Sequence, residues 1–208
     1  MIILAHRGWW SDPAEKNTAA AFERALAAGF GLETDIRDHD GEVVIAHDPP
    51  RGGKHLRLEE LLALYQAAGQ PGALALNVKA DGLQSSVARA LKQSGVANAF
   101  VFDMAVPDAL GYSALGVSVF TRHSEVEPVP AFLDRAAGVW VDCFECDWIT
   151  KEVIESHLGG GRLVALVSPE LHRREHETAW LHWRGADPSV MICTDFPDRA
   201  QAFFGAIT

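Results

Sequence analysis

Short apolar runs alternate with amphipathic stretches along the whole chain. The runs are four to six residues long and rich in β-branched and aromatic side chains, which is typical of buried strands. They lie at Ile2–Ala5, Leu32–Ile36, Ala73–Val78, Ala99–Phe102, Gly116–Phe120, Gly138–Val141, Leu163–Val167 and Val190–Cys193. Helical patterns follow them at Thr18–Ala28, Leu58–Ala68, Leu83–Ser94, Pro107–Ser113, Pro128–Ala136, Lys151–Leu158, Arg173–Arg184 and Pro197–Phe204. The pair Asp40-Gly41 between two extended runs adds a predicted β-hairpin.

This alternation predicts the fold class. Strand–helix units repeated through 208 residues favour right-handed parallel crossovers and a single (β/α)8 TIM barrel of α/β class. No linker, low-complexity tract or charge block interrupts residues 1–208, so we expect one domain. In such barrels the active site lies at the carboxyl ends of the strands, and the polar residues that end each run therefore become the functional candidates.

The first of these strand ends combine histidines, a cation and carboxylates. His6 and Arg7 end the first run, and His47 follows the hairpin. Two histidines can divide proton transfer between a general base and a general acid. Glu33 and Asp35 are two residues apart on one strand, so both carboxylates point to the same face and suit Mg²⁺ or Ca²⁺. The combination is typical of phosphoryl chemistry.

The third strand adds an amide and a second cation. Asn77 and Lys79 are also two residues apart, which places them on a common face. Lys79 and Arg7 would together hold an anion, and Asn77 can offer an amide oxygen to a hard cation.

Several of these segments together resemble the glycerophosphodiester phosphodiesterase family. They are AHRG, the NT that enters the first helix, GLETDIRDHDGEVVIAHD, the lysine of the third run, VFD, TRHSEVE and CTDFPDRA. His-Arg-Gly followed by Glu-x-Asp and His-Asp is the most specific part, and the resemblance covers nearly the whole chain. It implies a (β/α)8 phosphodiesterase that hydrolyses small-molecule glycerophosphodiesters in lipid metabolism.

The resemblance also implies roles for individual residues. By position, His6 and His47 look like the catalytic acid/base pair. Arg7, Lys79 and Asn17 look like substrate-binding residues, and Glu33, Asp35 and Asn77 look like ligands of a divalent cation, Mg²⁺ or Ca²⁺.

The chain departs from the family pattern at three places. Asn77 stands where the family usually has a third metal-ligand glutamate, and one fewer negative charge should weaken metal binding. Lys16 stands where Pro-Glu-Asn-Thr has a carboxylate. No sizeable capping segment separates IAHD from the next helix, which predicts a more open pocket.

The composition of the chain limits the classes of molecule that it is expected to bind. A net charge of −10 argues against non-specific binding to nucleic acid or to an anionic membrane surface. No apolar stretch approaches the roughly 20 residues of a membrane span. With three cysteines and no basic leader before the first run, we expect a cytoplasmic protein without disulfides, and Cys143 and Cys146 as free thiols. The oligomeric state cannot be inferred from the sequence.

Two other functions are compatible with parts of the sequence. Asn77 and Lys16 also suit a catalytically impaired barrel that binds an anionic sugar phosphate or a protein partner. The segment from His172 to His176 formally matches the H-x-x-E-H pattern of some zinc peptidases. We place His172 to His176 at the entry of the seventh helix rather than in the barrel mouth. The residues SPELH at 168–172 follow the seventh run directly, so we also expect that they can line the substrate pocket.

Overall fold

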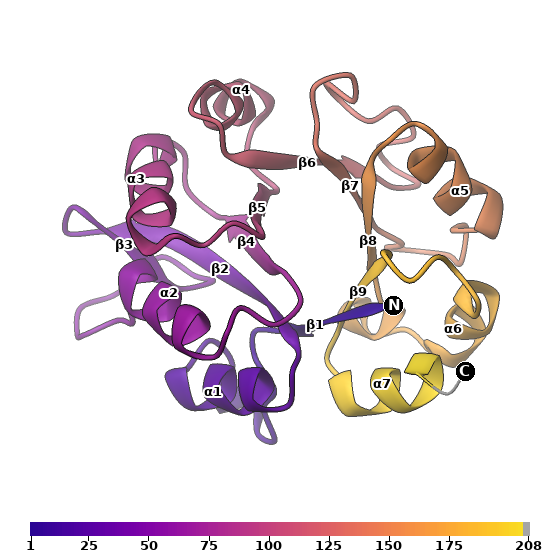
Figure 1. Cartoon of the computed structure of the whole chain (residues 1–208), viewed down its shortest axis with the longest axis horizontal. Coiled ribbons are helices and arrows are strands. Elements are labelled where there is room, and N and C mark those ends of the chain that lie inside the picture. Colours follow the sequence, from indigo (N-terminus) through magenta and orange to yellow (C-terminus); the bar gives the residue numbers. More distant parts are fainter. Residues whose placement is uncertain (206–208) are drawn as a thin grey trace.

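The computed structural model describes residues 1–205, which form a closed parallel barrel ringed by helices (Figure 1). The strands are β1 (Ile2–His6), β2 (Gly31–His39), β3 (Glu42–Ile45), β4 (Leu74–Val78), β5 (Ala99–Phe102), β6 (Ser118–His123), β7 (Gly138–Val141), β8 (Leu163–Val167) and β9 (Met191–Thr194). β1 pairs with both β2 and β9, which closes the ring. The predicted (β/α)8 barrel is confirmed.

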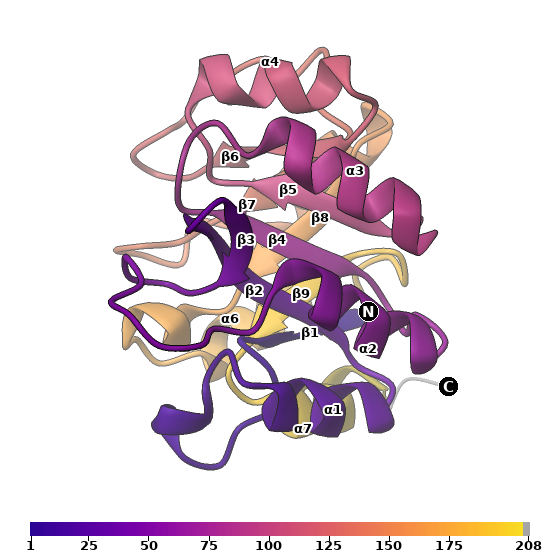
Figure 2. The same ribbon diagram turned by 90° about the vertical axis from the view of Figure 1, so that its left-hand side faces the viewer.

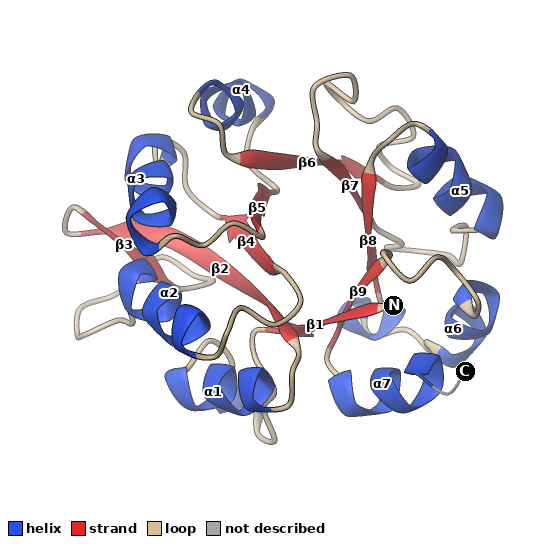
Figure 3. Cartoon of the chain, in the orientation of Figure 1, coloured by secondary structure: helices blue, strands red, loops and turns tan. Residues whose placement is uncertain are grey.

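Helices cover the outside of this ring (Figure 3). They are α1 (Ala19–Ala27), α2 (Leu58–Ala67), α3 (Gln84–Ser94), α4 (Val106–Ala114), α5 (Lys151–Gly159), α6 (Glu177–Trp183) and α7 (Pro197–Gly205), with short 3₁₀ helices η1 (Pro13–Glu15) and η2 (Pro169–His172). Figure 2 shows α1, α2, α3 and α4 following one another along one side of the barrel. No helix within residues 1–205 is long and apolar enough to cross a bilayer.

The predicted β-hairpin is present. β3 runs antiparallel to β2 and extends it outside the ring. Asp40 and Gly41 connect the two strands with φ angles of 49° and 83°. Left-handed conformations at both turn positions are those of a tight hairpin turn, for which Asp-Gly is a favoured pair.

One predicted helix is absent and another is shorter than predicted. Residues 128–136 form turns after β6 instead of a helix, because Pro128 and Pro130 lack N–H donors and Phe132 has a φ of 42°. Figure 1 shows a loop at this point of the ring. The predicted helix from Arg173 is also shorter: Arg173 ends η2 with a φ of 61°, and α6 begins only at Glu177.

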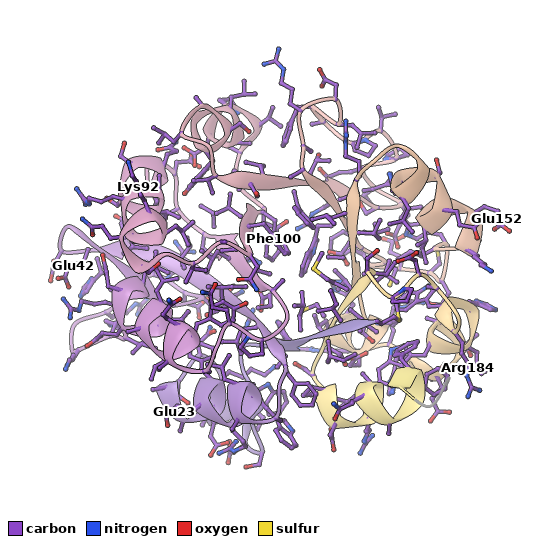
Figure 4. All side chains as sticks on the ribbon, viewed as in Figure 1. Glu23, Glu42, Lys92, Phe100, Glu152 and Arg184 are labelled. Atoms are coloured by element: carbon purple, nitrogen blue, oxygen red, sulfur yellow. The ribbon has the colours of Figure 1, made fainter. Side chains whose placement is uncertain are left out.

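The apolar residues form two separate cores. One fills the barrel itself, where Phe100 stacks on Phe120 and Phe102 stacks on Trp140 with centroid distances of 3.7 and 3.9 Å. The other lies between the strands and the surrounding helices. In Figure 4, Phe100 lies within the ring of strands, whereas the labelled charged side chains lie around the rim. The aromatic layer in the barrel provides the floor on which polar groups at the strand ends are placed.

Close strand packing predicts the effect of adding one methyl group at Gly31. A Cβ on Gly31 would lie 2.5 Å from the backbone oxygen of Ala73, which cannot move without disturbing β4. We expect Gly31→Ala to lower the free energy of unfolding by about 2 to 3 kcal/mol. A Cβ on Gly159, at the end of α5, would meet no atom within 4 Å. Gly159→Ala is therefore the control, expected to stay within about 1 kcal/mol of wild type in urea unfolding. Equal stability of the two variants would contradict this packing.

Candidate active site

Polar side chains follow the apolar residues of the barrel interior at the carboxyl ends of the strands. His6 lies two residues beyond the interior Leu4, and Asp195 lies two residues beyond the interior Cys193. Strand alternation turns such residues toward the barrel axis. They surround a cavity of about 250 Å³ whose polar lining residues are His6, Arg7, Glu33, Asn77, Lys79, Asp103, Arg122, Asp142 and His172. The cavity lies at the end of the barrel where the sequence predicted these polar groups.

His6 is oriented by Asp195. The Nδ1 atom of His6 lies 2.6 Å from Oδ1 of Asp195. An ionised carboxylate only accepts hydrogen bonds, so Nδ1 donates and Nε2 is left as the basic nitrogen. Burial lowers the pKa of His6 below its ordinary value, although the bond to Asp195 acts in the opposite direction. His6 is therefore a neutral base near pH 7.

Asp195 is itself held from two directions. Lys16 Nζ lies 3.4 Å from its Oδ2 atom, and Glu170 on η2 accepts a hydrogen bond from its backbone N–H at 3.1 Å. Burial alone would raise the pKa of Asp195, but the hydrogen bond from His6 and the charge of Lys16 keep it below its ordinary value. The lysine that departs from the family pattern thus contacts the carboxylate that orients His6.

Asp35 is a buried carboxylate that forms ion pairs with two cationic side chains of the site. Its side chain is fully buried, with Arg7 Nε 2.9 Å from Oδ2 and Lys79 Nζ 3.7 Å from Oδ1. Asn17 donates from Nδ2 to Oδ2 at 2.9 Å, while its own Oδ1 accepts from Thr34 at 2.8 Å. Sequence reasoning did not foresee this pairing. It placed Arg7 and Lys79 on an anion and Asp35 on a metal.

Arg7 has an unusual backbone conformation. Its φ is 59°, and the following Gly8 has a φ of 88°. A Cβ on Gly8 would lie 2.8 Å from the Ala21 backbone carbon, so Gly8 lets the chain turn against α1. The backbone oxygen of Arg7 accepts from Asn17 N at 2.9 Å. Left-handed non-glycine residues are uncommon, and at functional sites they hold side chains in position.

Glu33 is the second carboxylate at the end of β2. It pairs in register with His6 on β1, and its Oε2 atom lies 3.8 Å from His6 Nε2. Burial, followed by the nearby charge of Asp35, raises the pKa of Glu33 to about 8. At neutral pH this carboxyl group is mostly protonated unless another positive charge approaches it.

Three oxygens on β2 and β4 lack partners. Glu33 Oε2, Asp35 Oδ1 and Asn77 Oδ1 are buried and have no hydrogen-bond partner among the described residues. Asp35 and Asn77 are also paired in register across the two strands. Buried oxygens without donors are costly, and hard cations bind such oxygens. The residues therefore fit a divalent cation, although no three His, Cys, Asp or Glu side chains within residues 1–205 cluster closely enough to hold one.

The opposite wall of the cavity carries residues to which sequence reasoning assigned no role. Arg122 Nε donates to Asp103 at 3.1 Å, and Arg122 Nη1 lies 3.5 Å from Asp142 Oδ2. His172 Nε2 lies 2.6 Å from Asp142 Oδ1. The sequence places Arg122 and Asp142 at strand ends, and each follows an interior aromatic residue by two positions, but it did not indicate what they do.

The remaining histidines lie in different settings. His172 lies in the cavity lining, as the expectation for residues 168–172 allowed, so only the placement of the whole His172–His176 segment away from the barrel mouth is wrong. It ends η2, whereas His176 caps α6 and packs against Trp180, so the H-x-x-E-H segment does not form one helical metal pair. His47 is on the loop after β3, its side chain is 47% exposed, and Nδ1 lies 2.9 Å from Asp48. Cys143 and Cys146 are free thiols, as expected.

Larger hollows lie elsewhere on the surface. One of about 960 Å³ lies between α3 and residues 115–118, at the amino ends of β5 and β6. Barrel enzymes place their chemistry at the other end, so the smaller cavity at His6 is the candidate site.

Known structures share this fold. No family model and no curated protein matches the chain. A glycerophosphodiester phosphodiesterase from Agrobacterium tumefaciens is 17% identical with a TM-score of 0.75, over 99% of this chain and 100% of that one. A glycerophosphodiester phosphodiesterase from Parabacteroides distasonis is 18% identical with a TM-score of 0.71, and the match covers 99% of this chain and 97% of that one. Tryptophan synthase from M. tuberculosis is 14% identical with a TM-score of 0.60, and the match covers 98% of this chain and 90% of that one. At these identities the likeness shows the barrel fold.

The raised pKa of Glu33 predicts a pH-dependent stability. The folded protein keeps the proton up to about pH 8, whereas an unfolded glutamate loses it near the ordinary pKa of 4.5. The stabilisation from the protonated group is complete below the unfolded pKa and is lost as the pH rises through the folded pKa. Glu33→Gln keeps a neutral group at every pH.

We expect Glu33→Gln to resemble wild type near pH 4.5 and to be more stable by on the order of 2 kcal/mol at pH 8.5. Urea unfolding in chelator at both pH values measures this. A difference that is the same at both would contradict the burial of an ionisable group at this position.

Proposed function

We propose that the protein hydrolyses a phosphodiester, with a glycerophosphodiester as first choice of substrate. The observation that carries this proposal is the neutral His6 held by Asp195 beside cations and unpartnered oxygens in one cavity. The similarity in fold to glycerophosphodiester phosphodiesterases from Agrobacterium tumefaciens and Parabacteroides distasonis supports it, as do the His-Arg-Gly, Glu-x-Asp and His-Asp motifs.

Cations beside His6 would bind the phosphate. Arg7 contacts Asp35 through Nε, and no hydrogen bond within residues 1–205 involves its two Nη groups. Those groups and Lys79 can hold the non-bridging oxygens and offset the charge that develops in the transition state. Both ends of the Asn17 amide are bound to the protein, so we propose that Asn17 supports substrate binding by orienting Asp35.

Proton transfer would be divided between two groups. His6 Nε2 accepts a proton from the nucleophile, which is water or a neighbouring substrate hydroxyl. For the proton on the leaving alkoxide we propose His47, which the loop after β3 presents next to Asp48. With Asp195 fixing the tautomer of His6, the base needs no reorientation during the reaction.

Glu33, Asp35 and Asn77 would hold a divalent cation, Mg²⁺ or Ca²⁺. When bound, such an ion neutralises charge on the phosphoryl oxygens. Each of the three residues keeps one buried oxygen without a hydrogen bond, and at Asp35 the ion would compete with Lys79, whose Nζ lies 3.7 Å from Oδ1. We further propose that the enzyme acts in the cytoplasm, on small diesters of lipid metabolism.

One observation favours a second candidate function. Lys16 Nζ contacts the same Asp195 carboxylate that orients His6. A cation at that point weakens the hydrogen bond to the imidazole and suits a barrel that binds an anionic sugar phosphate without turnover. Tight binding of a phosphomonoester together with no hydrolysis of any diester would favour this candidate.

Removal of His6 tests the proposed reaction. We expect His6→Ala to lower kcat for glycerophosphodiester hydrolysis by about 10² to 10⁴-fold, because the variant lacks the base. Asp195→Asn should also lower kcat, because an amide at this position can stabilise the wrong tautomer of His6. His182→Ala, on an exposed face of α6, is the control and should keep wild-type activity. A His6→Ala variant with unchanged kcat would contradict the proposal.

The metal site has its own test, which needs no turnover. Asn77→Asp adds a carboxylate next to two unpartnered oxygens and is expected to tighten Mg²⁺ or Ca²⁺ binding by about tenfold at pH 8.5. Glu33→Gln should weaken binding by a similar factor. Calorimetric titration with each ion measures both effects. If neither variant changes the affinity, the ion does not bind at these three residues.

A further inference from the structure

The outer face of α4 is apolar. Among residues 104–121 the only charged residue is Asp108, which is buried and accepts a hydrogen bond from Gln84 at the start of α3. The exposed residues of the helix and of its end, which we call the α4 face, are Val106, Pro107, Leu110, Ala114 and Leu115. Spacings of three and four residues place the first four on one stripe. A helix that is apolar on its inner and its outer face is normally covered on both.

Exposed apolar side chains concentrate around this helix. Seven large apolar residues are exposed within residues 1–205, and five of them belong to α4, to its end or to the loop of residues 124–136. Val106 lines a small hollow together with Glu127 and Phe132, so the first turn of α4 adjoins this loop. The loop takes the place of the helix predicted after β6, and Figure 1 shows α4 between α3 and the loop. The apolar surface is therefore a property of this sector of the ring.

Charges of opposite sign flank the α4 face. On the α3 side, Arg89 and Lys92 line a hollow together with Leu115, and within residues 1–205 neither cation forms an ion pair. On the other side, the loop of residues 124–136 contains three carboxylates and one cation. Its Glu127 has a half-exposed side chain, 3.4 Å from Arg122 Nε. The surface thus changes from a positive flank through an apolar stripe to a negative flank.

This charge pattern is complementary to itself. Consider a two-fold axis that lies in the plane of the α4 face and crosses midway between the flanks. It places the positive flank of one copy against the negative flank of the other. The stripe between the flanks then packs against its own copy. Because the stripe carries no exposed charge, its burial leaves no ion without a partner.

A lipid surface matches the α4 face less well. Helices that lie in a membrane interface carry Lys or Arg along their polar face, whereas α4 contains neither. The carboxylates of the adjoining loop would also be repelled by anionic head groups. The observed charges therefore favour a protein surface that is itself apolar at its centre.

We infer that the α4 face is the contact surface between two copies of this chain related by a two-fold axis. In the dimer, Arg89 and Lys92 of one copy lie against Glu127 of the other, and Leu110 lies near the axis. The second copy covers the outer face of α4. This inference does not depend on the proposed hydrolysis.

Sedimentation equilibrium of the full chain at about 1 to about 100 μM tests the inference. Wild type should show twice the 22.6 kDa mass of the chain. Leu110→Asp places a charge in the centre of the stripe and should weaken the dimer by about 100-fold or more. The matched control is Leu181→Asp, which changes another exposed leucine, on α6, and should remain dimeric.

Charge reversal tests the two flanks separately from the stripe. Arg89→Glu together with Lys92→Glu should weaken the dimer by about tenfold, because two carboxylates would then face Glu127. Adding Glu127→Lys to this variant should restore part of the lost affinity, since the flanks are again opposite in charge.

A wild type that is monomeric throughout this concentration range would overturn the inference. If that monomer binds phosphatidylcholine vesicles, the α4 face contacts lipid instead. A dimer that Leu110→Asp weakens no more than Leu181→Asp does would place the contact elsewhere on the surface, and unchanged affinity after charge reversal would exclude the proposed pairing of the flanks.

Discussion

The carboxylate of Asp35 constrains the whole site. A fully buried negative charge is tolerated only where donors and cations surround it. Here Arg7 and Asn17 reach it from the segment after β1, and Lys79 reaches it from the end of β4. This carboxylate therefore joins three elements, and it fixes the direction in which the chain leaves β1. His6, the last residue of β1, directly precedes this segment and pairs in register with Glu33 on β2.

The aromatic layer below the site determines its electrostatics. Phe102 and Trp140 stack at the floor of the cavity, and the interior beneath them is apolar. Above this layer the side chains of Glu33 and His6 are largely buried, and burial raises the pKa of Glu33 and lowers that of His6. Both shifts favour neutral groups near pH 7. Fixed dipoles and charges in such a site interact more strongly with a developing phosphoryl charge than they would in water.

The sequence was sufficient to predict the barrel fold and part of the candidate site. Alternating runs predicted the strands, and the period of two placed Glu33 with Asp35 and Asn77 with Lys79. The positions of Asp142 and Asp195 at strand ends were also evident from the sequence, but their roles were not. Two features depend on three-dimensional packing, namely the left-handed backbone of Arg7 and the contact of Lys16 with Asp195. Residues outside the strands were also hard to predict, because the period of two does not apply to them.

His172 lies outside the strands, at the end of a 3₁₀ helix between β8 and α6. Its place after the seventh run indicated that residues 168–172 can line the pocket, but not which side chain reaches the cavity. The missing helix after β6 is a similar case, since prolines at 128 and 130 outweighed an amphipathic pattern. Local backbone geometry, which depends on a few turn residues, limited the prediction of both segments.

Cleavage of a phosphorus–oxygen bond at this site can be followed by ³¹P NMR of a glycerophosphodiester incubated with the protein in ¹⁸O-labelled water. We expect a growing phosphomonoester signal that carries the isotope shift of one ¹⁸O on phosphorus, and no such signal with His6→Ala. A diester that persists unchanged, or a phosphomonoester without the label, would show that the site does not cleave this bond.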